Sequence, residues 1–431
     1  MQHRLLTAAS AFISLSDLEL IARSSGFILR SSPKCSASGF LFTLIQAVIH
    51  GTSSLDQIAQ KLGAFEPLCM TRQALQNRFS ERSTQFLKDV LGQLIRARGQ
   101  RLLPSLSGDL FRRILIEDST VIPMAKSNAD IFPNNGNCRG LTAGCKINLV
   151  TDVLRGSVVS SRMCSARQPA QKLATDILNT CREGDLIIRD RGYFSTTAIW
   201  GIEERGAFWL SRLPASVTAF GRGEATLLKL LRSTKGNTLD RLITIGTRRP
   251  HKCRLIARRL TAEETAKNRR LRRKEAKKRG AVASTEGLAR DAWSLVVTNV
   301  PKTKASARTL SEFYAFRWSI EISFRALKQS SRLHQSLNHK AGRYQIEALV
   351  LASMILHVMS VRTHAILQRR ETDIDEAIYS LEKVAKSVAH YIATRTRITL
   401  TEPYTPDRRH LRHDRRTDRI TLTQLMICYL T

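Results

Sequence analysis

The segment from residue 110 to residue 213 alternates short apolar runs with helical patterns, and this alternation constrains the fold most. Residues 111–123 (FRRILIEDSTVIP) are a β-rich apolar run, and residues 145–163 contain two more runs joined by a turn at Arg155-Gly156. A helix, a strand with a glycine turn, a second helix and a last strand are predicted at 170–180, 185–194, 196–206 and 207–213. This order of elements predicts an α/β core.

The first 105 residues have a helical pattern, with apolar residues at helical spacing in 40–51 and 84–95. Between them, residues 53–79 indicate two helices joined by a turn region, and Thr71 is placed to cap the second helix. That second helix carries side chains able to reach DNA bases or phosphates, namely Arg72, Gln73, Gln76, Asn77 and Arg78. A small helical bundle with a polar face explains the same pattern.

Residues 214–290 interrupt the α/β pattern and contain the basic run KNRRLRRKEAKKR at 267–279, which is either a solvated face or a phosphate-binding arm. Strand character returns at 292–300, a long helix is predicted over 307–333, and the tail 410–419 is basic. We therefore expect five parts: a helical DNA end-binding domain, a first part of the core, a basic β-rich insertion, a last part of the core and a helical C-terminal region. Their expected bounds are 1–105, 106–213, 214–300, 301–335 and 336–431.

The chain is strongly basic, since 69 Lys and Arg against 36 Asp and Glu give a formal net charge of +33. Self-repulsion of this size is usually offset by a polyanionic partner, and nucleic acid fits better than a membrane surface because the charge is spread along the whole length. The longest apolar stretch, 346–361, contains Glu347 and His357 and is shorter than the ~20 residues of a membrane span. We expect a buried core helix there, no signal peptide and no membrane partner.

The eight cysteines form no CxxC pair and have no finger-like histidine pair downstream. Reduced thiols are therefore expected rather than zinc ligands or disulfides.

Three acidic residues are predicted at positions that commonly border a cleft. Asp118 and Asp190 are expected at the ends of two buried strands, and Glu321 on the late helix. Two strand-end aspartates and a helix glutamate are suited to two divalent ions, and their hard oxygens favour Mg²⁺, or Mn²⁺ in its place, over zinc. Taken singly, each acid is better explained by a cap or an ion pair with a neighbouring arginine than by catalysis.

The spacing Tyr314-x2-Arg317-x3-Glu321-x6-Lys328 favours a functional site over these structural roles. On one helix these four side chains share a face, which then carries one acid, two bases and a phenol. Facing DNA, the acid would bind metal while the two cations and the hydroxyl hold phosphates.

With this motif the chain resembles the DDE transposases of bacterial insertion sequences, in the subgroup marked by a Y-R-E-K helix. The second aspartate of that family lies in a D-x-G-[YF] segment, which here is Asp190-Arg191-Gly192-Tyr193. The resemblance implies an RNase H-like mixed sheet with flanking helices, interrupted by the basic β-rich insertion. It also implies that Asp118, Asp190 and Glu321 are the catalytic, metal-binding acids.

Trp293 and Arg212 are further DNA-binding candidates. In relatives, a tryptophan at the end of the insertion stacks on a flipped base, and an indole can replace lost base stacking. A core tryptophan explains Trp293 equally well. Arg212 ends the strand that follows Asp190, where it could contact the DNA backbone.

The sequence therefore predicts a transposase that binds the terminal inverted repeats of its element, cleaves DNA with Mg²⁺ and transfers the freed 3′ ends to target DNA. The resemblance implies a homodimer in a synaptic complex with double-stranded DNA, in the bacterial cytoplasm beside the nucleoid. Two alternatives stay open: a structure-selective nuclease or resolvase on the same core, and a non-catalytic DNA-binding protein.

Overall fold

The computed structural model describes residues 13–52, 54–96, 110–136, 140–221, 226–247, 249–369 and 379–393. The basic tail 410–419 lies outside these residues. The chain forms two compact units. The first contains Met1–Ser105, Asp118–Gln168 and Trp318–Gln424, and the second contains Leu106–Glu117, Pro169–Arg317 and Leu425–Thr431.

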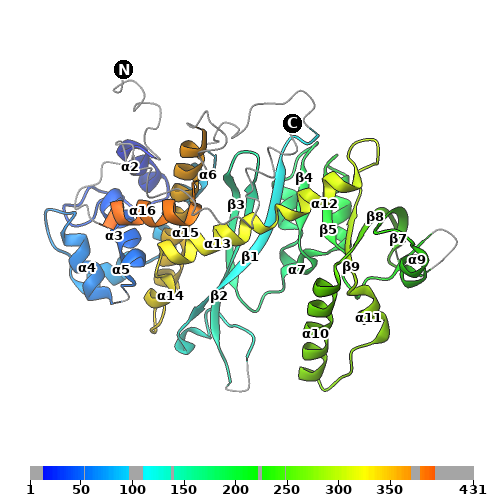
Figure 1. Cartoon of the computed structure of the whole chain (residues 1–431). Coiled ribbons are helices and arrows are strands. Elements are labelled where there is room, and N and C mark those ends of the chain that lie inside the picture. The colour runs from blue at the N-terminus through cyan, green and yellow to red at the C-terminus, as the bar shows by residue number, and fades with distance from the viewer. Residues whose placement is uncertain are drawn as a thin grey trace. The chain divides into compact units, whose positions relative to one another are not determined.

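The described strands follow the sheet order β3-β2-β1-β4-β5-β9-β8-β7-β6 (Figure 1). β1 (Ile114–Met124) pairs in parallel with β4 (Leu186–Arg189), and β4 pairs in parallel with β5 (Phe208–Arg212). β2 (Ala143–Asp152) and β3 (Ser157–Ser165) form an antiparallel hairpin. The expected α/β class with an RNase H-like mixed sheet is therefore confirmed.

Local sequence explains these strands. All four residues of β4 are buried, as expected for a central parallel strand that is covered on both faces. Gly156 closes the β2–β3 hairpin with a φ of 53°, a left-handed conformation that glycine adopts without a Cβ clash. The predicted turn at Arg155-Gly156 is correct.

The segment after β5 extends the second unit's part of the sheet. Its last strand, β9 (Trp293–Thr298), pairs antiparallel with both β5 and β8 (His251–Arg259). Figure 1 shows these strands with the neighbouring helices of the segment. The other elements are β6 (Ala219–Phe220), α9 (Leu227–Ser233), β7 (Thr238–Ile245), α10 (Ala262–Lys278) and α11 (Thr285–Arg290).

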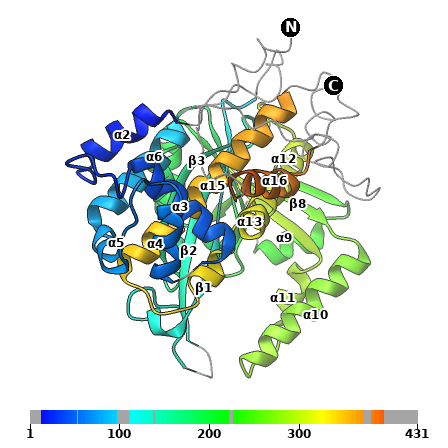
Figure 2. The ribbon, with the colours of Figure 1, turned by 90° about the vertical axis from the view of Figure 1, so that its left-hand side faces the viewer.

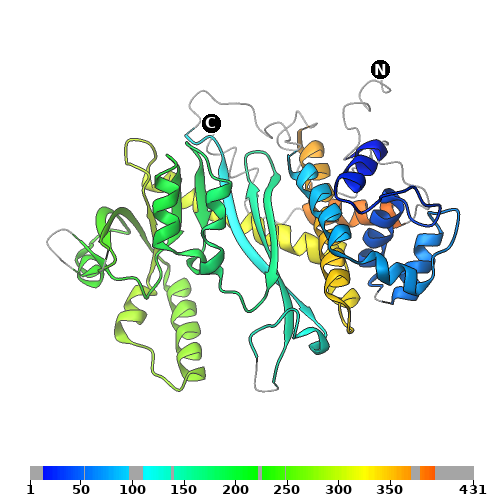
Figure 3. The same ribbon diagram turned by 180° about the vertical axis from the view of Figure 1, so that it is seen from behind.

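The first unit is mainly helical and is built around α15 (Arg343–Arg369). This helix packs against α3, α6, α16 and β3, and Figure 3 shows α6 running beside it. Among the described helices, α15 is the one long and apolar enough to cross a membrane, but 94% of its apolar window is buried in the protein. The expected buried core helix is thus confirmed.

Of the remaining helices of the first unit, α13 and α14 also contact α15, whereas α2 and α4 pack on α3 and α5 packs on α4 (Figure 2). The helices around α15 and α3 are α2 (Leu15–Ser24), α3 (Ala37–His50), α4 (Leu55–Gly63), α5 (Arg72–Arg78), α6 (Glu81–Arg96), α13 (Trp318–Ser330), α14 (Leu333–Ser336) and α16 (Leu381–Ala393).

The single helix predicted over 307–333 is wrong, because α12 (Ala307–Ala315) ends before α13 begins at Trp318. The amides of Phe316 and Arg317 each donate to the carbonyl three residues back, at 3.1 Å. Such bonding brings residues three apart into line, and the rings of Phe313 and Phe316 lie 5.5 Å apart with both side chains buried. The tighter turn therefore lets both phenylalanines enter the core.

The single helix predicted over 170–180 is also wrong. It is divided into α7 (Ala170–Leu173) and a 3₁₀ turn, η3 (Asp176–Asn179). The Ala174 carbonyl accepts a 2.7 Å hydrogen bond from Arg189, while the Leu178 amide donates to Thr175 instead. An arginine from a distant strand thus takes the acceptor that a continuous helix would use.

We predict that His357 makes stability fall in mild acid. Burial in α15 lowers the pKa of His357 to about 4, whereas its ordinary value is 6.5. Between these values the unfolded chain binds a proton that the folded chain does not, so the unfolding free energy falls as the pH drops from 6.5 towards 4, by about 3 kcal/mol in all. Urea unfolding at pH 7 and pH 5 should show a loss of about 2 kcal/mol that His357→Gln removes. An equal loss in both proteins would contradict this role.

Candidate active site

The last pair in the β1–β4 register is Glu117 with Arg189. Asp118 and Asp190 are the next residues along the two strands. Asp190 leaves β4 as the residue before η4 (Arg191–Tyr193), as predicted. Asp118 does not end its strand, because β1 continues to Met124. It is instead the first residue beyond the part of β1 that pairs with β4.

A buried ion pair lies directly before these two aspartates. Arg189 Nη2 is 2.8 Å from Glu117 Oε2, with the side chains 4% and 0% exposed. Buried charges are costly unless they are paired and hydrogen-bonded, and Arg189 also donates to Ala174. Sequence reasoning did not select Glu117 or Arg189 as site residues. Their signal was an acid and a base, each directly before an aspartate at the end of a predicted strand.

Tyr314 of α12 lies against Asp190 within the second unit. Its hydroxyl is 3.5 Å from Asp190 Oδ1 and 3.4 Å from the Arg189 carbonyl, both at the long end for a hydrogen bond. Burial, reinforced by Asp190, raises the pKa of Tyr314, whereas the nearby arginines Arg212, Arg317 and Arg191 oppose the rise. The phenol is therefore a neutral donor aimed at the carboxylate.

Arg212, at the end of β5, completes this cluster. Its guanidinium is 6.0 Å from the centre of the Tyr314 ring, and the side chain is exposed. The structure thus brings together three predicted residues from three elements: Asp190, Tyr314 and Arg212. A carboxylate, a phenol and an exposed cation can bind a metal and a phosphate side by side.

The other members of the helix motif lie on or beside α13. Arg317 is half-buried at the break between α12 and α13, and Glu321 is half-buried in the first turn of α13. Lys328 lies in the last turn, seven residues after Glu321 and on the same helix face. Burial of part of its side chain lowers the pKa of Lys328.

The three predicted acids have the right donor chemistry for a divalent metal. Asp118, Asp190 and Glu321 are half-buried carboxylates, whose hard oxygens fit Mg²⁺ or Mn²⁺ better than zinc. In the part of the chain that the structure describes, no group of three or more His, Cys, Asp or Glu side chains is gathered closely enough to hold an ion.

Trp293 is largely buried at the start of β9, with 8% of its surface exposed. The guanidinium of Arg259, its partner in the β8–β9 register, lies 4.4 Å from the centre of the ring. One face of the indole therefore already carries a stacked cation.

Arg72 and Gln76 are both exposed and lie one turn apart on α5. Thr71 caps this helix as predicted, accepting from the Ala74 amide at 3.3 Å. Only Leu75 of the helix is buried, and the polar residues 72, 73, 76 and 77 are exposed to solvent. Arg72 lies 3.7 Å from Asp56 of α4, an exposed pair that is easily replaced by a phosphate contact.

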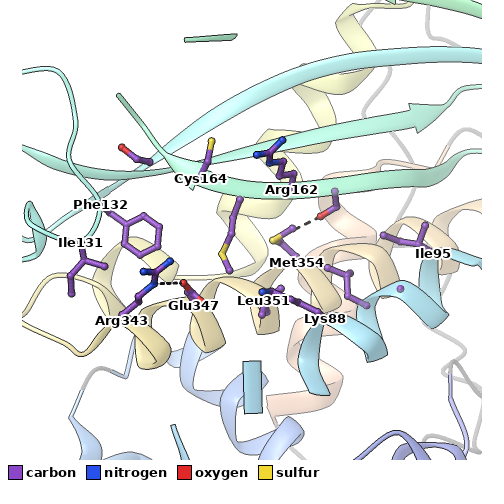
Figure 4. A pocket seen from close by; sticks show the side chains of 15 residues that line it. Lys88, Ile95, Ile131, Phe132, Arg162, Cys164, Arg343, Glu347, Leu351 and Met354 are labelled. Atoms are coloured by element: carbon purple, nitrogen blue, oxygen red, sulfur yellow. Dashed lines mark hydrogen bonds and ion pairs between the residues drawn. The ribbon is translucent and has the colours of Figure 1, made fainter. Parts of the chain in front are cut away.

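A pocket with a volume of about 620 Å³ lies in the first unit, between α6, β3 and α15 (Figure 4). Figure 4 shows Arg343 and Glu347 of α15 at its wall, joined by a 2.9 Å ion pair, with Met354 and Leu351 further along the helix. None of the predicted site residues lines this pocket. The candidate active site is therefore the group around Asp190, not this cavity.

Several known proteins are similar to this chain. The family described as "Transposase DDE domain" matches residues 109–356. The transposase for insertion sequence element IS231E of Bacillus thuringiensis subsp. finitimus is 26% identical over 387 residues, which is 83% of this chain and 80% of the relative. The transposase for IS1151 of Clostridium perfringens is 23% identical over 394 residues, 84% and 82% of the two chains. A solved structure, the piggyBac transposase synaptic complex with hairpin DNA, matches with a TM-score of 0.42 and 8% identity over 88% of this chain and 77% of that one.

We predict that Arg189→Met is strongly destabilising. The change leaves the buried Glu117 carboxylate without this cation, so the unfolding free energy should fall by about 3–5 kcal/mol in urea titrations. Adding Glu117→Gln should recover part of the loss, because no uncompensated charge then stays buried. The matched control is Arg23→Met, which removes the exposed pair with Glu19 and should cost less than about 1 kcal/mol. Equal losses for Arg189→Met and Arg23→Met would rule out a stabilising role for the buried pair.

Proposed function

The chain belongs to the family of transposases with a DDE domain, of the bacterial insertion-sequence type, and from this premise we propose that it binds the terminal inverted repeats of its own element and joins the freed 3′ ends to target DNA. Members of this family bind and cleave DNA, transfer strands and use divalent metal. One contact carries the proposal for this chain: the Tyr314 hydroxyl lies 3.5 Å from Asp190 although 124 residues separate them in sequence. Two halves of the predicted motif thus meet.

Asp118, Asp190 and Glu321 are the proposed metal ligands and catalytic acids, and Mg²⁺, with Mn²⁺ as a substitute, is the proposed metal. Bound there, the metal supplies charge that activates an attacking oxygen and stabilises the leaving one. The β1–β4 register supports this assignment, because the two aspartates follow its last pair. The Glu117–Arg189 ion pair would hold the two strand ends at a fixed separation.

The cations of the site are proposed to hold DNA phosphates. Arg212, Arg317 and Lys328 would bind the backbone beside the scissile bond, where guanidinium groups make bidentate contacts. Tyr314, kept protonated, would donate a hydrogen bond and fix the orientation of the Asp190 carboxylate. Trp293 is proposed to stack on a DNA base, in which case the base displaces Arg259 from the ring face.

We further propose that the helices of residues 1–105 read the element end through Arg72 and Gln76, which are exposed on α5. The five-part division of the chain at residues 105, 213, 300 and 335 stays a proposal. So do a homodimer in a synaptic complex with double-stranded DNA, and a place in the bacterial cytoplasm beside the nucleoid.

A structure-selective nuclease on the same core is the competing enzyme. If the purified protein cut branched DNA with Mg²⁺ but never joined a 3′-OH end, it would be such a nuclease and not a transposase. A non-catalytic DNA-binding protein would instead bind the repeats and cleave nothing under any metal condition.

We expect Asp118→Ala, Asp190→Ala and Glu321→Ala each to lower the rate of cleavage by about a thousandfold or more, because losing a metal ligand removes several kcal/mol of transition-state stabilisation. DNA binding in mobility-shift assays should survive. The reaction is measured on a duplex that carries the element's inverted repeat, with Mg²⁺ or with EDTA, which should abolish cleavage by the wild type. Glu183→Ala, which removes an exposed acid, is the matched control and should cleave normally. Wild-type cleavage rates in the three variants would refute these catalytic assignments.

Arg72→Ala and Gln76→Ala should weaken binding to the inverted repeat by about 1–3 kcal/mol each if these side chains contact base edges. Binding to unrelated duplex should change less, so the ratio of the two affinities should fall. Gln60→Ala on the neighbouring α4 is exposed and serves as the control. If both affinities stayed at the wild-type level, α4 and α5 would form a bundle whose polar face has no DNA-reading role.

A further inference from the structure

α10 is a helix of 17 residues without a single buried residue. Helices in proteins are normally held by burial of an apolar face, so polar contacts must position this one. Thr261 and Glu264 form a capping box at its start. Arg272 makes a bidentate pair with Asp291 at 2.6 and 2.7 Å, and Arg269 donates to the Leu288 carbonyl at 3.1 Å. Figure 3 shows α10 running beside α11 in the second unit.

These contacts define a packed face and an outer face. With 100° per residue, the half-buried Thr265, Asn268, Arg269, Arg272 and Ala276 fall on one side of α10. The opposite side carries six exposed cations, namely Lys267, Arg270, Arg273, Lys274, Lys277 and Lys278. We call these six residues the cationic face. The acid on this side, Glu263, lies in the first turn, where its negative charge interacts favourably with the helix dipole.

The cationic face is unfavourable for the isolated chain. Its members lie three or four residues apart, as in Arg270–Arg273 and Arg270–Lys274, and like charges at these spacings destabilise a helix. Among the described residues, no ion pair joins any of the six to an acid. α10 carries this repulsion although it contributes no residue to the core, and a polyanionic partner would offset it.

We propose that the cationic face of α10 binds the phosphate backbone of duplex DNA without reading its sequence. Lys267 and Lys278 are eleven residues apart, so the face is about 16 Å long, a length over which a duplex presents about ten phosphate charges. The face consists of four lysines and two arginines, cations that contact phosphates whatever the base sequence, while Asn268, whose amide could read adenine, lies on the packed side and donates to the Asp291 carbonyl. A membrane surface would require apolar residues beside the cations, and Leu271 is the one large apolar residue of the helix.

This inference rests on the proposed function only in taking DNA as the partner, and its test is independent of cleavage. The variant combines Arg270→Gln, Arg273→Gln, Lys274→Gln and Lys277→Gln. The control combines Arg270→Lys, Arg273→Lys, Lys274→Arg and Lys277→Arg, which keeps every charge. Fluorescence anisotropy of the full chain on two labelled duplexes, one with the inverted repeat and one without, gives the affinity between about 50 and 200 mM salt.

The slope of the logarithm of the association constant against log salt concentration is negative. We expect it to become less steep by about 2–4 in the Gln variant, equally on both duplexes, and to be unchanged in the control. Removing repulsion should not unfold α10, which circular dichroism checks. An unchanged slope overturns the proposal, and so does a loss confined to the inverted-repeat duplex. Binding of the wild type to anionic phospholipid vesicles that the Gln variant loses, with DNA binding intact, would assign the face to a membrane instead.

The two hypotheses fail separately. If the wild type cleaves and joins ends while the slope does not change in the Gln variant, only the role of α10 fails. If the wild type never cleaves but the slope falls, the cationic face binds DNA and the transposase activity fails.

Discussion

The ion pair between Glu117 and Arg189 is the interaction on which the arrangement around Asp190 depends. It closes the pairing of two parallel strands at the point where each is followed by an aspartate. The same arginine takes the Ala174 carbonyl and divides the preceding helix, and its own carbonyl lies next to the Tyr314 hydroxyl. Arg189 thus links β1, β4 and the end of α7 through its guanidinium, and α12 through its backbone carbonyl. The cost of burying the guanidinium is offset only while Glu117 and the Ala174 carbonyl stay in place, which makes the local geometry cooperative.

Charge is distributed unevenly between the interior and the surface. The buried arginines that the structure describes are each paired with an acid, namely Arg189 with Glu117, Arg113 with Asp185 and Arg254 with Asp240, whereas the buried Lys146 donates to the Gln168 carbonyl. Among the described residues, a dense group of exposed cations lies on α10, in a chain whose formal net charge is +33. Folding therefore uses acids to neutralise buried bases, whereas the surface leaves its positive charge for a partner.

The sequence predicted the strands and the order of elements well, because β4 and β5 are short apolar runs and the β2–β3 turn has its glycine. It also placed Asp190, since this residue directly follows a run that is buried throughout. It failed at 307–333 and 170–180, where helical periodicity continues across a break. In both cases the cause is a contact from elsewhere or a tight turn, such as the bond from Arg189 to Ala174, which local patterns do not encode. The pairing of Tyr314 with Asp190 was likewise invisible as a contact, because it depends on how α12 packs on β4 and β5.

The way the sheet ends in the second unit has a consequence for self-association. β9 covers the side of β5 that would otherwise expose a row of unpaired amides and carbonyls, and the strands beyond it taper to β6, which has two residues. Among the described residues, however, β6 pairs only with Thr244 and Ile245 of β7, so most of that border is the edge of β7 itself. Asp240 and Arg241 lie in the middle of this edge, and charged side chains on an edge strand disfavour pairing with a strand of another molecule. Charge, rather than shortness, therefore keeps the end of the insertion from joining a second sheet.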